Sequence, residues 1–257
     1  MLSSVADNLY WMSRYLERAE HTARLLDVNV HGALEGTPEG ARRRWERLST
    51  SLRIPLTGPT LDGRSITQIC ALDTANPESI VSCIASARDN AREAWEQISS
   101  EMWEQINRLY LFVSKTNIDD IYRGEPHAFF AAIKQGAHLF QGIADSTMSH
   151  GEGWQFIGVG RGIERATATT NLLGAYFTPE AADPEGESPA YLEWVGLLKS
   201  CTAFEAYVKC YSADIQPRGI AEFLLLNTEF PRSVRFVCAS IKSGLGAIGR
   251  TIETRGS

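Results

Sequence analysis

Apolar residues recur every three or four positions along most of this 257-residue chain, whereas strictly alternating apolar and polar positions are almost absent. The first spacing is typical of amphipathic helices and the second of half-buried strands. Glycine, proline and serine stand between the periodic stretches, as they do at helix ends. The pattern predicts an all-α protein, with helices over residues 2–30, 39–50, 77–115, 126–149, 152–177, 188–212, 217–227 and 231–246.

Two stretches interrupt this pattern. Residues 53–65 are RIPLTGPTLDGRS, and residues 178–189 are TPEAADPEGESP, which is acidic and predicts an exposed loop. Neither stretch is a long flexible linker. We therefore predict one compact multi-helix bundle over residues 1–257.

A charged segment occurs twice in the chain. RYLERAEHTARLL at residues 14–26 is similar to RGIERATATTNLL at residues 161–173. The residues that recur at one constant offset are Arg14, Glu17, Arg18, Ala19, Thr22, Leu25 and Leu26 in the first copy and Arg161, Glu164, Arg165, Ala166, Thr169, Leu172 and Leu173 in the second. The repeat predicts a bundle of two divergent halves, residues 1–125 and 126–257.

The two copies differ in what surrounds their charges. In the first copy, Arg14, Glu17 and Arg18 share a helix stripe opposite an apolar one, which is normally a solvated face. In the second copy, the charged stripe also carries apolar residues, namely Trp154, Ile157, Ala168, Leu172 and Ala175. Because its opposite stripe is apolar too, the second helix is predicted to run through the interior with its charges partly buried.

Buried charges need partners, since an unpaired ion costs several kcal/mol to desolvate. Arg88 and Arg92 lie on an apolar stripe of the predicted helix 77–115, provided that this helix has no kink near ISSEMW. We predict that they neutralise Glu17 and Glu164. Such a network is either a structural ion lattice between central helices or a pocket in which arginines hold an anion and a glutamate accepts a proton from an amine.

Four blocks of the chain resemble the alpha-E domain family, all-helical bacterial proteins with a Glu-Arg motif. The blocks are NLYWMSRYLERAEHTARLLDVN, ARDNAREAWEQISSEMWEQIN, GWQFIGVGRGIERATATTNLL and DIQPRGIAEFLLLNTEFPRSVRF, and they keep the family's order over nearly the whole chain. The resemblance implies an all-α fold. It also implies a circularly permuted ATP-grasp protein as partner, often with a transglutaminase-like peptidase, in a system that forms and cleaves amide bonds.

The resemblance also suggests which residues matter. It implies that Glu17 with Arg18 and Glu164 with Arg165 are the motif residues, and it matches Arg14, Arg88, Arg92 and Arg161 to nearby family positions. This sequence departs from the pattern at Gly158, Gly160 and Gly162, where larger helix formers are more usual in the family. Interior glycines cost up to about 1 kcal/mol each relative to alanine, so either the helix is irregular there or another backbone comes close.

Residues and resemblance together predict a component of an ATP-grasp-linked system that forms amide bonds or modifies peptides. It would bind an amino acid or a peptide between the two Glu-Arg helices, with Glu17 and Glu164 as catalytic candidates. The substrate-binding candidates are Arg14, Arg18, Arg88, Arg92, Arg161, Arg165, Arg218 and Arg232. The alternative is a non-catalytic helical partner that docks the ATP-grasp protein, its charge network being structural.

Arg218 and Arg232 are secondary candidates. Each follows a proline at a predicted helix start, in QPRG at 216–219 and FPRS at 230–233. Proline is favoured at the first helical position for its own backbone geometry, which explains these turns without any ligand. The functional alternative is an anion site, because the free N–H groups of a helix start and a neighbouring arginine both attract anions.

Composition excludes several other classes of protein. A net charge of −6 disfavours a nucleic-acid binder, which relies on clustered lysines and arginines. The chain has no long apolar run and no signal peptide, so we expect a cytoplasmic protein without a membrane span. The five cysteines form no C-x-x-C pair, His21 follows Glu17 at the wrong spacing for a di-iron bundle, and GLGAIG follows no predicted strand. We predict neither a metal nor a cofactor.

Overall fold

The computed structural model describes residues 1–34, 37–54, 62–177, 189–211 and 214–255, and over these residues it is built from helices without strands. The predicted all-α fold is confirmed. The helices are α1 (Ser3–Leu34), α2 (Pro38–Leu52), α3 (Gly63–Thr67), the π-helix η1 (Gln68–Leu72), α4 (Ile80–Glu93), the 3₁₀ turn η2 (Trp95–Gln97), α5 (Ser100–Lys115), α6 (Ile118–Arg123), α7 (Pro126–Thr147), α8 (Glu152–Tyr176), α9 (Pro189–Ser200), α10 (Phe204–Tyr211), α11 (Pro217–Leu226) and α12 (Val234–Arg255).

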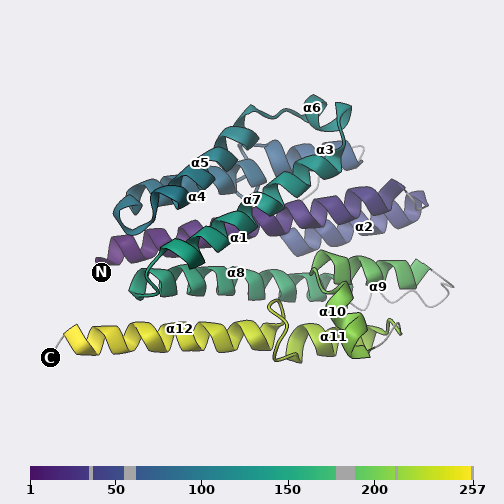
Figure 1. The fold of residues 1–257 in the computed structure, drawn as a ribbon. Coiled ribbons are helices and arrows are strands. Elements are labelled where there is room, and N and C mark those ends of the chain that lie inside the picture. The colour runs from purple at the N-terminus through teal and green to yellow at the C-terminus, as the bar shows by residue number, and fades with distance from the viewer. Residues whose placement is uncertain (35–36, 55–61, 178–188, 212–213, 256–257) are drawn as a thin grey trace.

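Helices α1 and α8 run side by side through the middle of the bundle (Figure 1). Helices α4 and α7 pack against α1, and α5 packs against both of them. On the other side, α12 packs along α8, which also contacts α2. The two segments that carry the Glu-Arg motif are therefore the two central helices.

The apolar stripe predicted for the first helix lies in the core. Leu9, Met12, Leu16, Ala19, Ala23 and Leu26 are buried there. Together with apolar residues of the packed helices they form one hydrophobic cluster. Burial of this stripe is what holds a helix as long as α1 within the bundle, since helix propensity alone stabilises isolated helices only weakly.

The predicted helix 77–115 is wrong in one respect, because it is two helices. Helix α4 ends at Glu93, and α5 begins only at Ser100, where the Ser99 side chain accepts a hydrogen bond from the Met102 N–H. A serine in this N-cap position starts a new helix. The break turns α5 back onto α4, so residues on either side of it no longer share one stripe.

The other boundaries also differ from the prediction. The predicted helix 188–212 divides into α9 and α10 at Thr202, whose φ of 52° is left-handed and ends the first helix. The last helix continues to Arg255, and the predicted break at 53–65 gives way to α3 from Gly63. Most of the predicted acidic loop 178–189 lies outside the described residues. The division into two repeated halves stays a prediction.

Helix α8 is regular through its glycines, and one of them allows a close helix approach. A Cβ on Gly160 would overlap the Tyr10 carbonyl oxygen and the Ser13 side chain of α1. A Cβ on Gly162 would press on Ile241 of α12, whereas Gly158 faces open space. The close backbone approach anticipated from the sequence therefore occurs at Gly160, and it brings the motif residues of α1 and α8 within reach of each other.

Candidate functional site

The two Glu-Arg motifs meet across the interface of α1 and α8 as crossed ion pairs. Glu17 of α1 accepts hydrogen bonds from Nε and Nη2 of Arg165 at 2.8 and 2.9 Å. In the opposite direction, Arg18 of α1 donates from Nε and Nη2 to Glu164 at 2.6 and 2.9 Å. Both contacts are bidentate, the geometry in which a guanidinium binds a carboxylate most strongly.

Glu164 receives a second arginine. Arg14 donates from Nε to the Glu164 carboxylate at 2.9 Å, and its Nη2 lies 2.8 Å from the same oxygen. Its guanidinium carbon is also 4.8 Å from the ring centroid of Trp11. Arg18 in turn uses its remaining amino group on Glu78, which is 43% exposed. Both oxygens of the Glu164 carboxylate therefore accept hydrogen bonds from arginines of α1.

Glu17 belongs to a deeper group of charges. Arg232, just before α12, donates to Glu17 and to Glu20, each at 3.0 Å. Glu20 also accepts two hydrogen bonds from Arg24, which in turn donates to the carbonyl of Ser200. We call these eight residues the Glu-Arg cluster: Arg14, Glu17, Arg18, Glu20, Arg24, Glu164, Arg165 and Arg232.

Sequence reasoning missed Glu20 and Arg24, both of which are buried. A signal was present, because Glu20 follows the core residue Leu16 by four positions and Arg24 follows Glu20 by four, which places both charges beside the apolar stripe. The sequence marked Arg232 as a candidate anion-binding residue, and the anions that it contacts are Glu17 and Glu20 of the same chain.

The cluster keeps Glu17 and Glu20 ionised. Burial alone would raise the pKa of Glu17, but the charges of Arg232 and Arg165 outweigh it and hold the pKa at about 2. The pKa of Glu20 is also well below its ordinary value, because Arg24 and Arg232 outweigh its burial. Both carboxylates are therefore charged at neutral pH, and neither is a proton acceptor there.

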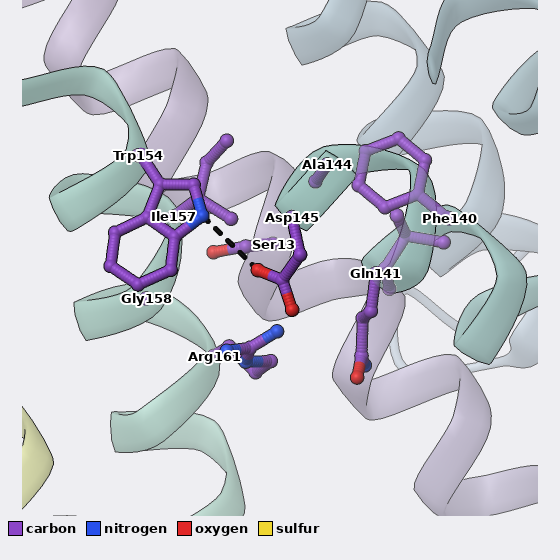
Figure 2. Close-up of a pocket in the computed structure, with 10 residues that line it drawn as sticks. Ser13, Phe140, Gln141, Ala144, Asp145, Trp154, Ile157, Gly158 and Arg161 are labelled. Atoms are coloured by element: carbon purple, nitrogen blue, oxygen red, sulfur yellow. Dashed lines mark hydrogen bonds between the residues drawn. The ribbon is translucent and has the colours of Figure 1, made fainter. Parts of the chain in front are cut away.

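A small cavity lies at the edge of the cluster, between α1, α7 and α8. Figure 2 shows Trp154 donating to the Asp145 carboxylate, with the Arg161 guanidinium nearby. The Trp154–Asp145 distance is 3.1 Å. Burial lowers the pKa of Arg161, and the charge of Arg165 adds to the effect. Glu17 and Glu164 do not line this cavity, whose volume of about 10 Å³ is room for roughly one water molecule.

Four of the predicted arginines lie outside the cluster: Arg161, which lines the small cavity, and Arg88, Arg92 and Arg218. Arg88 donates to Asn107 at 2.8 Å and stacks over Tyr110, and Arg92 is exposed beside Asp89 and Glu93. Arg218 is exposed at the start of α11. The prediction that Arg88 or Arg92 neutralises a motif glutamate is wrong, because it assumed one straight helix across the break between α4 and α5.

The described residues contain no group of three or more histidine, cysteine, aspartate or glutamate side chains placed to hold a metal ion. Among the same residues, no helix is both long enough and apolar enough to cross a membrane.

The fold and the cluster together define a class: all-helical domains in which two long helices are joined by crossed glutamate and arginine pairs. The chain belongs to the Alpha-E family, which is described as a predicted alpha-helical domain with a conserved ER motif and whose family model matches residues 1–257. The family resemblance noted in the sequence is thereby confirmed.

The curated relatives do not name an activity. An uncharacterized protein of Mycobacterium bovis and two of Mycobacterium tuberculosis strains are each 24% identical to the chain over 271 aligned residues, which cover 94% of this chain. The same alignment covers 29% of each relative, so the chain spans less than a third of their length. No solved structure matches the chain significantly.

Proposed function

We propose that this chain is a non-catalytic helical partner of an ATP-grasp protein, in a system that forms amide bonds or modifies peptides. In this proposal the Glu-Arg cluster holds the two central helices in register. The observation that carries it is the saturation of the motif carboxylates. Glu17 contacts Arg165, Arg232 and Gln141, and Glu164 contacts Arg14 and Arg18.

A catalytic glutamate would need two properties that Glu17 lacks. It must reach a substrate, yet Glu17 is 1% exposed and does not line the small cavity beside the cluster. A general base must also have a pKa near the working pH, and the pKa of Glu17 is about 2. The geometry therefore favours the docking interpretation over the catalytic one that assigns Glu17 and Glu164 to chemistry.

The partner is inferred from the family and from the relatives. The resemblance to alpha-E proteins implies the circularly permuted ATP-grasp protein, and a transglutaminase-like peptidase as a further component. In the mycobacterial relatives more than two thirds of the protein lies outside the matched region, as expected for a domain that works beside another. ATP chemistry and the amino-acid or peptide substrate would belong to the partner, and both proteins would act in the cytoplasm.

Co-expression tests both parts of the proposal. The chain is produced with the ATP-grasp protein encoded beside it, complex formation is measured by size-exclusion chromatography, and peptide products are measured by mass spectrometry. We expect a stable complex, and an unchanged product yield when the chain carries Glu164→Gln and remains folded. Failure of the unmodified chain to form a complex would refute the partner role.

A doubly substituted chain tests directly whether the motif glutamates are catalytic. Glu17→Gln combined with Glu164→Gln removes both motif charges while keeping the side-chain volumes. We expect lower stability, but full product yield at a temperature where circular dichroism shows the chain to be folded. A folded double variant that still binds its partner and yields no product would instead establish a catalytic Glu-Arg site.

A further inference from the structure

A second and much larger cavity lies at the end of the bundle beyond the cluster. Its volume is about 630 Å³, within the range of small-molecule sites. The end of α1, the middle of α2, the start of α7 and helix α9 each supply part of its wall. None of its lining residues belongs to the Glu-Arg cluster.

Arg44 of α2 brings a positive charge into this wall. Its guanidinium lies between two glycines that also line the cavity: a Cβ on Gly32 would be 2.7 Å from Nη1, and a Cβ on Gly196 would be 3.8 Å from the same atom. A side chain at position 32 would displace the guanidinium. The absence of a side chain at position 32 therefore makes the space that the Arg44 head group occupies.

Arg44 has no acid to neutralise it among the described residues, which distinguishes it from the arginines around it. Arg42 pairs with Glu39 and Glu46, and Arg47 pairs with Glu193 at 2.7 Å. The Nε atom of Arg44 is buried without a hydrogen-bond partner. A buried donor of this kind is costly unless a ligand or water satisfies it.

The other charged residues of the cavity make its α9 side and its α7 side different in charge. Lys199 of α9 is a second cation, and it too makes no ion pair with the described part of the chain. On the α7 side, Asp27 is held by Lys134 at 2.6 Å and by His127 at 2.8 Å. Glu125 at the start of α7 and His31 of α1 complete the titratable lining.

Apolar side chains make up much of the remaining wall. Val195 and the exposed Leu192 come from α9, and Val30 and Phe130 come from α1 and α7. A cavity with an unneutralised guanidinium at one place and an aliphatic wall beside it suits a ligand with an anionic head and an apolar body.

We infer that this cavity binds a small organic anion, a carboxylate or a phosphate ester on an apolar body. The anionic group lies against Arg44 and Lys199, and the body lies against Leu192 and Val195. Arginine suits this role because its planar fork binds either head group bidentately. The inference is independent of the proposed partner role, with which it shares no residue.

Two fluorescent probes test the inference. Anilinonaphthalene sulfonate carries an anionic group on an aromatic body, and phenylnaphthylamine has the same body without the charge. We expect saturable binding of the sulfonate at one site per chain. Arg44→Gln weakens it about tenfold or more, the amount that one lost charge-assisted contact accounts for. Arg42→Gln, two residues away on the same helix, is the matched control and leaves binding unchanged.

The uncharged probe and a steric variant distinguish binding in this cavity from nonspecific hydrophobic binding. Binding of phenylnaphthylamine does not depend on Arg44, and Gly196→Leu, which places a side chain in the cavity beside Arg44, weakens binding of the sulfonate. A Cβ at Gly196 meets only ordinary contacts, and circular dichroism checks that the variant is folded. Displacement by phenylacetate and by phenyl phosphate then ranks the two head groups. No saturable sulfonate binding, or equal binding in Arg44→Gln and the unmodified chain, would overturn the inference.

Discussion

Glu17 of α1 and Arg165 of α8 form a bidentate ion pair whose carboxylate is 1% exposed. The pair of Arg18 with Glu164 runs in the opposite direction across the same interface. Each central helix therefore contributes one carboxylate and one guanidinium to the interface. Sliding or rotating either helix would leave buried charges unpaired, which costs far more than the pairs themselves contribute. The cluster thereby selects one register of α1 on α8.

Removing the Glu17 charge should destabilise the fold strongly. Glu17→Gln leaves Arg165 without a counter-charge and Arg232 with Glu20 alone. We expect a loss of roughly 3 to 5 kcal/mol in the free energy of unfolding, the range for breaking a buried pair. Glu78→Gln, which removes the exposed partner of Arg18, should cost about 1 kcal/mol or less. Urea denaturation of both variants measures the difference, and equal small losses would contradict the structural role.

The two motif arginines, Arg18 and Arg165, should differ in how much they contribute to the stability of the fold. Their own side chains are almost equally exposed, 15% for Arg165 and 17% for Arg18, so the difference comes from the carboxylates they leave behind. Arg165→Ala leaves the more deeply buried Glu17 with Arg232 alone, which Glu17 shares with Glu20, and should cost about 3 kcal/mol. Arg18→Ala should cost less, because Glu164 keeps Arg14. Thermal unfolding ranks the variants, and the reverse order would refute this account.

Acid should unfold the protein partly through Glu17. Its pKa is 4.5 in the unfolded reference and about 2 in the folded protein. The stabilisation is therefore complete above about pH 4.5 and is lost as the pH falls toward 2, amounting to roughly 3 kcal/mol. The unfolding free energy of Glu17→Gln should fall less steeply across this interval. Parallel pH curves for the two proteins would exclude Glu17 as the source.

His21 should make the stability of the fold depend on pH in a higher range than Glu17 does. Burial, and then the charge of Arg24, lowers its pKa from 6.5 to about 3, so the folded protein holds a neutral imidazole. Below pH 6.5 the His21 imidazole is protonated in the unfolded chain but stays neutral in the folded protein. The free energy of unfolding therefore falls as the pH drops from 6.5 toward 3. Between pH 7 and 5 we expect a loss of about 2 kcal/mol that His21→Gln abolishes. Urea midpoints at these two pH values provide the measurement.

Two neighbouring glycines of α8 should respond oppositely to alanine. Gly160→Ala places a methyl group against the Tyr10 carbonyl of α1, where backbone must move, and should cost at least about 1 to 3 kcal/mol. Gly158→Ala enters open space and should stabilise by about 0.5 to 1 kcal/mol through helix propensity. Circular dichroism melts of both variants check the signs, and stabilisation by both would mean that α1 and α8 do not approach closely at Gly160.

The sequence by itself determined the helical class, most helix positions and the buried stripe of α1. These properties are local, because the spacing of apolar residues within one helix already says which side faces the core. It also predicted that the second Glu-Arg segment runs through the interior, since a helix with apolar stripes on both sides can bury both only there, whereas the charged side of the first segment matched a solvated face. A kink near Ser99 was considered, but the sequence did not decide for it, because the helical spacing continues on both sides of the break.

Only the tertiary structure decided which charges meet. Arg232 is more than two hundred residues from Glu17 in the chain, yet it contacts the carboxylate directly, while Arg88 fits the helical pattern and contacts Asn107 instead. Periodicity orients a side chain about its own helix axis and carries no information on the rotation, offset and crossing of the helix that faces it. Those depend on how all the packed side chains fit together, including the space left at Gly160, and so they became visible only in the folded chain.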